Sequence, residues 1–358
     1  MTILNTREIL ESEGFRTSPS RNGRILEAAK LFNDAEAGNA YAQARLLEAF
    51  TTSDFPGLLG AAFEIEAIHA YRAAEPEWKL YADEFKVTDF KKKRLVDILG
   101  RGYFEDVAQG EEYKAAKASE EYRDIQAGKA GKLFGLTWEL RKNRDFSDLS
   151  DFPTRLANDG IRTANRKVMQ AIADATGFKA SFFGTVDTKA LSADNLDAAL
   201  NGLGLKENFR GDLVDTSKMV LLHSPGNRAI VRRLLTATEV EFTDGNKKVR
   251  LPNPWAGIIT PVESKELAAT ITDTGKRATS WALLPAPGSE NPAVAKVTMT
   301  GEENVDIRVK RDQGASVGGG DLPVDAGSFN DDTIWYRGRL VTGGAALFAD
   351  ATYASAGA

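Results

Sequence analysis

The sequence predicts an α+β protein with N-terminal helices, a charged two-stranded ribbon, one long helix and a mixed body of strands and short helices. Three observations favour this class. Apolar residues recur at helical spacing through residues 150–177. Short apolar or alternating runs typical of strands lie on both sides of that stretch. Links rich in proline and glycine separate these runs, as turns do.

The composition is that of a chain able to bury one or two cores: 358 residues, 42% hydrophobic and 27% charged. The absence of cysteine excludes disulfides, thiolate metal sites and a cysteine nucleophile. The first residues lack the apolar core of a secretory signal, and no stretch approaches the roughly 18 apolar residues of a membrane helix. We therefore expect no membrane partner. A net charge of −5 gives no broad basic footprint, so any contact with nucleic acid must be local.

Residues 1–78 are interpreted as short helices with narrow apolar faces, one of them formed by Ile25, Leu26, Ala29 and Phe32. Isolated helices of this length are marginal in water, so they should pack on the body or on a neighbouring chain. We expect a helical arm, and deleting residues 1–50 should leave the body folded but impair assembly with neighbouring chains. The helix that follows position 55 carries His69, interpreted as a partly buried structural histidine.

Residues 84–90 and 94–99 are strand-like, with three lysines at 91–93 between them. The lysines could meet a phosphate backbone, although a solvated strand end is the simpler interpretation. Further strand-like pieces, at 113–119 and 133–140, flank the sequence AGKAGK, whose two glycines predict a turn. This ribbon has too few apolar residues to form a hydrophobic core of its own, so it should lie on another surface.

The long helix is predicted over residues 151–176, capped by Ser150 and ended by Gly177. At 1.5 Å per residue it would be about 39 Å long. The residues expected to face a sheet recur at helical spacing with one five-residue step: Leu156, Ile161, Ala164, Val168 and Ile172. Three basic residues fall mostly elsewhere on the helix, and could face packaged nucleic acid or form salt bridges between subunits: Arg162, Arg166 and Lys167.

Downstream of the long helix the pattern is mixed. A short amphipathic helix over 191–204 should be capped by Ser192. The apolar strand 218–223 leads directly into a helix, with Ser224 as its predicted N-cap and Pro225 at its first position. A hairpin is expected over 239–251, with Asp244 and Gly245 at the turn. More strands are expected around residues 277–285, 294–300, 305–310 and 333–348.

No catalytic, cofactor-binding or metal-binding residues are predicted. The two histidines, His69 and His223, lie in regions expected to be separate, and neither an HExxH helix nor a DxDxDG calcium loop occurs. Ser224 lacks the GxSxG context of a serine nucleophile. Adjacent carboxylates, Asp331 with Asp332 and Glu302 with Glu303, are typical of solvated turns. We therefore predict that the protein is not an enzyme and needs no cofactor.

Several stretches nevertheless suggest a family: TSDFPGLL, VTDF, GEEYKAAKASEEY, FGLTWELRKNRDFSDLSDFPTRLANDG, LLHSPGNRAIVRRLL and WYRGRLVTGG. In their order and content the chain resembles the major capsid proteins of tailed bacteriophages with the HK97-like fold, closest to Mu-like head subunits. The resemblance covers most of residues 51–358. Where the family often shows an NDDL-like run before its spine helix, this chain has RDFSDL.

The resemblance implies a division into six segments: an N-terminal arm (1–78), P-domain strands (79–103), an E-loop (104–142), P-domain with a spine helix at 151–176 (143–215), an A-domain (216–318), and a return to the P-domain and C-terminus (319–358). It also implies a head subunit that forms hexamers and pentamers of an icosahedral shell around double-stranded DNA. Such a subunit would be assembled in the host bacterial cytoplasm and found in the virion.

The implied partners are further copies of the chain, portal protein, scaffold, decoration proteins, and packaged DNA through weak non-specific contact. Some relatives carry a cross-linking lysine in the E-loop, where this chain has Lys114, Lys117, Lys129 and Lys132. None of these four can be aligned with it, so non-covalent contacts are the default expectation.

Three other functions were weighed. An encapsulin-like compartment has the same fold but holds a protein cargo, and the long N-terminal arm disfavours it. An enzyme of unknown class would need a convergent polar cluster, which the sequence does not suggest. A phage tail or connector protein would share the setting, but the position of the long helix argues against it.

Overall fold

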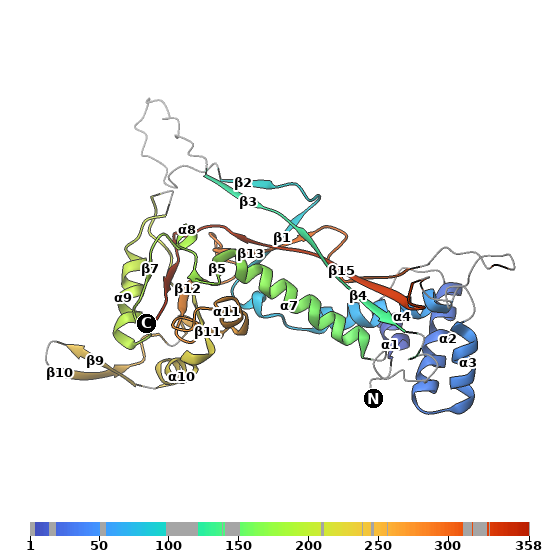
Figure 1. The fold of residues 1–358 in the computed structure, drawn as a ribbon. Coiled ribbons are helices and arrows are strands. Elements are labelled where there is room, and N and C mark those ends of the chain that lie inside the picture. The colour runs from blue at the N-terminus through green and yellow to red at the C-terminus, as the bar shows by residue number, and fades with distance from the viewer. Residues whose placement is uncertain are drawn as a thin grey trace, which may run out of the picture. The chain divides into compact units, whose positions relative to one another are not determined.

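The computed structural model describes residues 4–13, 19–50, 55–97, 121–137, 139, 151–208, 211–237, 239–244, 247–255, 257–310, 317, 328 and 330–357 (Figure 1). The chain divides into two compact units. Unit 1 is Met1–Glu75, Lys129–Thr163 and Gly301–Val341, and unit 2 is Pro76–Gly128, Ala164–Thr300 and Thr342–Ala358. Both the long helix α7 (Phe152–Ile172) and the long strand β15 (Ile334–Ala346) run from one unit into the other.

Four helices gather in unit 1 and are drawn in blue in Figure 1: α1 (Thr6–Glu13), α2 (Pro19–Glu36), α3 (Ala40–Phe50) and α4 (Phe55–Ala73). The expected helices are therefore present. The most apolar of them, α4, contacts the other three and also packs against β14 (Asp306–Val309). Its Phe63 is fully buried, with its ring edge-on to Phe32 of α2 and to Tyr336 of β15.

These helices are part of the core of unit 1, which revises the expectation of a dispensable arm. The cluster of buried residues that includes Phe32 and Leu46 extends to Ile307 and Tyr336 on the strands. Because the strands supply only one face of that core, deleting residues 1–50 would expose it.

Three strands form the unit 1 part of a five-stranded sheet. β14 pairs antiparallel with β15, with Asp306 opposite Arg339, and β4 (Gly128–Leu136) also pairs with β15. β15 alternates as a half-buried strand should: Tyr336 is buried whereas Arg337 is exposed. The predicted turn at AGKAGK is wrong, since those residues enter and continue β4. A Cβ on Gly131 would lie 2.8 Å from the Gly338 carbonyl oxygen, so glycine permits a close strand approach here, not a turn.

Unit 2 contains the other strands of that sheet, with β1 (Asp83–Val87) parallel to β13 (Val294–Met299) and β13 antiparallel to β15. A second five-stranded sheet has the order β11-β8-β12-β16-β7. Its strands are β11 (Ile259–Glu263), β8 (Met219–His223), β12 (Trp281–Pro285), β16 (Tyr353–Ser355) and β7 (Val186–Asp187). The central strands β8 and β12 are buried at every position, as their apolar sequences predicted.

Short helices and small hairpins complete unit 2. The helices are η1 (Glu77–Leu80), α8 (Ala180–Phe183), α9 (Ala193–Gly204), η2 (Pro225–Asn227), α10 (Arg228–Thr236) and α11 (Lys265–Thr270). The two-stranded pairs are β2 (Lys93–Asp97) with β3 (Glu121–Ile125), β5 (Ala173–Asp174) with β6 (Gly177–Phe178), and β9 (Glu239–Asp244) with β10 (Lys247–Pro252).

Several local predictions in unit 2 are confirmed. The Ser192 hydroxyl accepts a hydrogen bond from the Asn195 N–H at 3.2 Å and so caps α9. The hairpin at 239–251 is present, with Asp244 opposite Lys247. The strand-to-helix turn after β8 is present too, but Ser224 makes no side-chain cap there. A 3-10 turn, η2, separates it from α10, so the predicted N-cap is wrong.

Among the described residues, no helix combines the length and the apolar character needed to cross a bilayer.

Candidate functional site

The long helix buries four of the five residues predicted to face the core: Leu156, Ala164, Val168 and Ile172. Gly160 completes a line of buried residues with a regular four-residue step, and Ala157, Asn165 and Met169 are buried beside it. Ile161, expected in the core, is only half-buried. Gly160 takes the core position instead, because a Cβ there would already lie 3.3 Å from Val305 and 3.4 Å from Tyr71. A bulkier residue would not fit between those side chains.

The end of the helix was also misplaced. α7 stops at Ile172, four residues before the predicted end, because β5 and β6 form a small antiparallel hairpin with Ala173 opposite Phe178. Gly177 lies in that hairpin with a φ of 140°, so it serves the turn and not a helix cap. The start agrees with the prediction to one residue, and Ser150 lies outside the described residues.

Glycines on β15 allow its backbone to approach α7 within each unit. In unit 1, a Cβ on Gly338 would lie 2.4 Å from Leu156 Cδ1. In unit 2, a Cβ on Gly344 would lie 2.1 Å from the Lys167 carbonyl oxygen, whereas real Cβ atoms essentially never come under 3.0 Å. The WYRGRLVTGG motif is therefore explained by backbone packing: glycine is the residue that leaves room for the helix.

The three basic residues singled out on α7 have different surroundings. Arg162 and Lys167 are exposed. The Nε of Arg166 lies 3.3 Å from Glu266 Oε2 at the start of α11, within unit 2. The contacts expected for Arg166, with nucleic acid or with other subunits, did not include this pairing within the chain. Because the Arg166 side chain is 54% exposed, the pair is worth about 0–1 kcal/mol.

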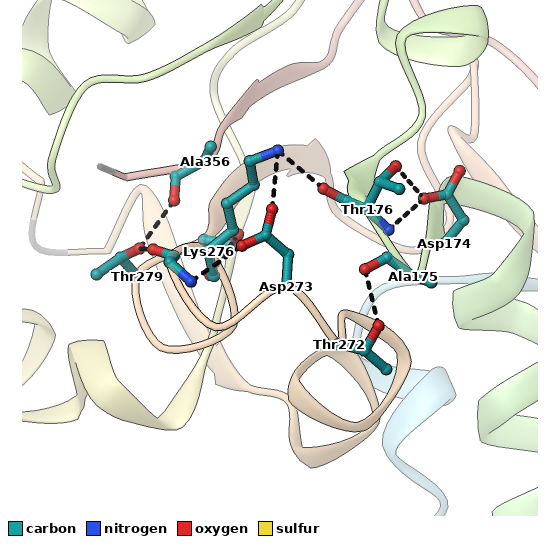
Figure 2. Close-up of polar contacts among 10 residues, drawn as sticks. Asp174, Ala175, Thr176, Thr272, Asp273, Lys276, Thr279 and Ala356 are labelled. Carbon is teal, nitrogen blue, oxygen red and sulfur yellow. Dashed lines mark hydrogen bonds and ion pairs between the residues drawn. The ribbon is translucent and has the colours of Figure 1, made fainter.

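A polar junction fixes the turn that follows α7 (Figure 2). The Thr176 N–H and hydroxyl both donate to Asp174 Oδ1, at 2.7 and 2.6 Å. These hydrogen bonds lower the pKa of the Asp174 carboxyl. The Lys276 ammonium donates to the Thr176 carbonyl oxygen at 3.0 Å and pairs with Asp273 at 3.3 Å. The loop after α11 is thus tied to the end of the helix.

The same loop binds the last residues of the chain. The Thr279 hydroxyl donates to the Ala356 carbonyl oxygen at 2.9 Å, as Figure 2 shows. A Cβ on Gly357 would lie 2.1 Å from the Thr279 carbonyl oxygen, so the two backbones are in close contact. Every group in this junction already has a partner within the chain, which makes it a structural joint.

The ribbon of β2 and β3 has few buried residues among those whose burial is described. Lys93 pairs with Ile125 and Arg94 with Asp124, and only Ile125 of these four is buried. Residues 98–120, which hold the predicted strand at 113–119 and the candidate lysines Lys114 and Lys117, lie outside the described residues.

The base of this ribbon is anchored in its own unit. The Arg123 guanidinium donates to the Leu347 carbonyl oxygen and lies over the Phe348 ring, 5.4 Å from its centroid. Gln126 Nε2 donates to the Phe90 carbonyl oxygen at 2.9 Å. One end of the ribbon is therefore held, while its described strands offer a mostly polar surface.

The other two candidate lysines lie on β4 in unit 1. Lys129 is exposed. The Lys132 ammonium is 2.9 Å from Asp159 Oδ2 on α7. Lys132 is thus engaged in an ion pair of its own unit, although both lysines are exposed.

The residues considered for catalysis are not assembled into a site. His223 is buried, with Nδ1 3.0 Å from the Ser224 carbonyl oxygen, and burial lowers the pKa of its imidazole. The Ser224 hydroxyl is buried and has no hydrogen-bond partner. His69 is half-buried on α4, as expected, and belongs to the other unit.

The paired carboxylates stabilise local structure. Asp331 Oδ1 accepts from the Ser328 hydroxyl and from the Thr333 N–H, and these hydrogen bonds lower the pKa of its carboxyl. Glu302 Oε2 lies 2.8 Å from Arg339 Nη2, and Glu303 Oε2 accepts from the Gly301 N–H at 3.1 Å. Within the part of the chain that the structure describes, no three histidines or carboxylates are placed to hold a metal ion.

Two charged features were missed by the sequence analysis. Lys296 is buried in β13, with Nζ 3.0 Å from Glu84 Oε1 and 4.6 Å from the Trp78 ring centroid. Burial lowers the pKa of its ammonium, although Glu84 acts in the opposite direction. The signal was present, since Lys296 is the one charged residue in the apolar run VAKVTMT. The second feature is the group of arginines on α10, a helix for which only the start had been predicted.

Comparisons with solved structures give distant likenesses. The capsid of cyanophage P-SCSP1u is 12% identical, covering 79% of this chain and 88% of that chain with a TM-score of 0.47. The capsid of a native GTA particle is 11% identical over 79% and 91%, with a TM-score of 0.47. An encapsulin complex from Synechococcus elongatus is 13% identical over 79% and 88%, with a TM-score of 0.39. At these values the likenesses do not bear on function.

Among curated proteins, none matches the chain in sequence. The family described as phage capsid protein does match, over residues 120–355, which is well over half of the chain. That range contains β3, β4, the long helix and all the later strands. The α+β class is confirmed, and the helices, ribbon, long helix and strands follow the order that the HK97-like resemblance implies. This chain belongs to the phage capsid protein family and is a major capsid protein.

Proposed function

We propose that the chain is the repeating subunit of a closed icosahedral shell, arranged as hexamers and pentamers around double-stranded DNA. Membership of the capsid family implies a structural protein of the virion that contacts further copies of itself. Portal protein, scaffold and decoration proteins are proposed as further partners, and the host bacterial cytoplasm as the place of assembly. The six segments named from the resemblance, with an E-loop at 104–142, are part of the same proposal.

The ribbon is the observation that supports this proposal most. Among the residues that the structure describes, β2 and β3 pair only with each other. Two-stranded sheets are marginally stable alone and need a further apolar surface. In a shell of head-to-tail contacts, an adjacent subunit would supply it. Obligate interfaces of that kind commonly bury about 2,000–5,000 Å² of surface in total. Extended elements help a subunit to reach that area.

Electron microscopy of the purified protein tests the proposal directly. We expect closed particles of uniform size, with nuclease-protected double-stranded DNA when they are isolated from phage-producing cells. Closed particles that hold protein cargo and no nucleic acid would favour an encapsulin-like compartment instead. A protein that stays monomeric under all conditions would contradict the shell.

Variants on α7 separate folding from assembly. Arg166→Ala removes the partner of Glu266, whereas Arg162→Ala removes an exposed charge from the same helix. Both proteins should stay soluble, because exposed ion pairs add about 0–1 kcal/mol. We expect altered particle yield or DNA content for Arg166→Ala and smaller changes for Arg162→Ala. Equal behaviour of the two variants would show that the Arg166 ion pair has no part in assembly.

A further inference from the structure

The exposed side of α10 carries three arginines around an open hollow in unit 2. The hollow has a volume of about 620 Å³ and is lined by Pro225, Gly226, Arg228, Ala229, Arg232, Arg233 and Thr236. On the opposite side of the helix, Val231 is 4% exposed and anchors α10 in the core. The arginines are therefore held on a fixed helix and not on a loop (Figure 1).

The charge in this hollow is only partly neutralised. Arg228 Nε donates to Glu263 Oε2 at 2.6 Å, and the pair is close enough to lower the pKa of the Glu263 carboxyl. Arg232 and Arg233 are exposed, and Arg233 Nε donates to the Ala229 carbonyl oxygen at 3.4 Å. That contact is to a neutral oxygen, so both guanidinium charges remain available to an anion.

The geometry suits an anion with repeated charges. Arg228 and Arg232 are four residues apart, so their side chains leave the helix on one face about 5–6 Å apart at Cβ. Gly226 closes one end of the hollow against a neighbouring loop, because a Cβ there would lie 2.4 Å from the Ala278 carbonyl oxygen. Guanidinium groups bind phosphate through paired N–H donors. Each strand of a DNA duplex carries one phosphate for roughly every 3.4 Å of the helix axis.

We propose that this arginine hollow of α10 is a contact site for the phosphate backbone of nucleic acid. The inference rests on the proposed function, because enclosed DNA is the polyanion that a phage shell would present to it. A chain with a net charge of −5 repels DNA overall. Close contact then requires a local concentration of positive charge, which Arg232 and Arg233 provide.

Titration of a fluorescent 30-base-pair duplex with the purified protein, between about 50 and 200 mM salt, tests this site. The variant is Arg232→Ala with Arg233→Ala, which keeps a good helix-former at both positions. The matched control is Lys30→Ala with Lys218→Ala, which removes two exposed positive charges elsewhere. Each phosphate contact contributes about 0.9 to the slope of log affinity against log salt, so the variant should lose about 1.8 of that slope.

The control should keep a slope close to that of the unsubstituted protein. In particles, the arginine variant should also show less nuclease-protected nucleic acid per particle than the control. Unchanged slope and content, or no binding of the duplex at all, would overturn the proposal. Stronger competition by polyglutamate than by DNA would overturn it in favour of an acidic protein partner. Particles are counted separately by microscopy. If no shells form but the salt dependence of DNA binding still requires the two arginines, only the proposed function is contradicted.

Discussion

Replacing Gly344 by alanine should destabilise unit 2 much more than its single added methyl group suggests. The new Cβ would lie 2.1 Å from the Lys167 carbonyl oxygen, 2.6 Å from its carbonyl carbon and 2.7 Å from Val168 Cα. All three are backbone atoms of α7, so no side-chain rotation can relieve the overlap. To reach even 3.0 Å, the strand and helix would have to separate locally by 0.9 Å, from 2.1 Å.

The free-energy cost follows from what that separation disrupts. Val168, Met169 and Ile172 are fully buried on the adjoining stretch of α7. Overpacking a core by one or more methylenes usually costs about 1–3 kcal/mol, and here the obstacle is rigid, so we expect about 3 kcal/mol. For a unit of this size, each kcal/mol lowers Tm by about 2–4 °C. The expected decrease in Tm is therefore about 6–12 °C, with a reduced soluble fraction.

Thermal unfolding followed by tryptophan fluorescence provides the assay, at one fixed protein concentration because assembly shifts the apparent stability. Gly202→Ala is the matched control. Gly202 lies within α9 of the same unit, and a Cβ there would have nothing within 4 Å. That variant should be neutral or stabilised by up to about 1 kcal/mol. If Gly344→Ala unfolded at the same temperature as the control, the close packing of β15 on α7 would be refuted.

Three further outcomes are expected. Ile172→Ala should cost about 2–5 kcal/mol in unfolding experiments, whereas Ile161→Ala, on the half-buried side of the same helix, should cost less than about 1.5 kcal/mol; equal losses would contradict the burial pattern. Deleting residues 1–50 should give insoluble protein, because those residues supply 9 of the 23 described buried members of the unit 1 core; soluble, folded protein in an expression test would count against this. Burial raises the pKa of Glu66, which accepts a hydrogen bond from the Thr6 hydroxyl. The folded state then binds the Glu66 proton more tightly than the unfolded state does, so this contribution to stability is complete below pH 4.5 and is lost as the pH rises through the raised pKa. Glu66→Gln should flatten that decline in a pH series of unfolding curves, and an unchanged series would disprove the assignment.

Much of the fold followed from local patterns. The apolar runs at β8 and β13, the capped helix α9 and the hairpin of β9 and β10 were placed within one or two residues, whereas β12 begins four residues later than predicted. These elements are determined by short-range chemistry: side-chain periodicity, a serine at a helix start, and a turn that favours glycine. The family resemblance rested on the same local stretches.

The wrong predictions concern positions whose local structure is determined by residues far away in the sequence. AGKAGK contains the residues of a turn, yet it enters and continues β4 because Gly131 allows close approach to the Gly338 backbone. Ile161 fits the helical period, yet Gly160 takes the core position, where even a Cβ would be in tight contact with Val305 and Tyr71. Neither neighbour could be read from the local sequence.

By itself the sequence determined the class of the fold, most element positions, the absence of cysteine chemistry and the resemblance to a capsid family. Tertiary structure alone decided that Gly160 takes a core position on α7 while Ile161 does not, that the N-terminal helices share a core with β14 and β15, that Arg166 pairs with Glu266, and that the α10 arginines surround a hollow. The physical reason is that periodicity fixes which residues share a face. Only the packed chain fixes what that face meets, because steric fit and charge pairing depend on atoms that are far apart in sequence.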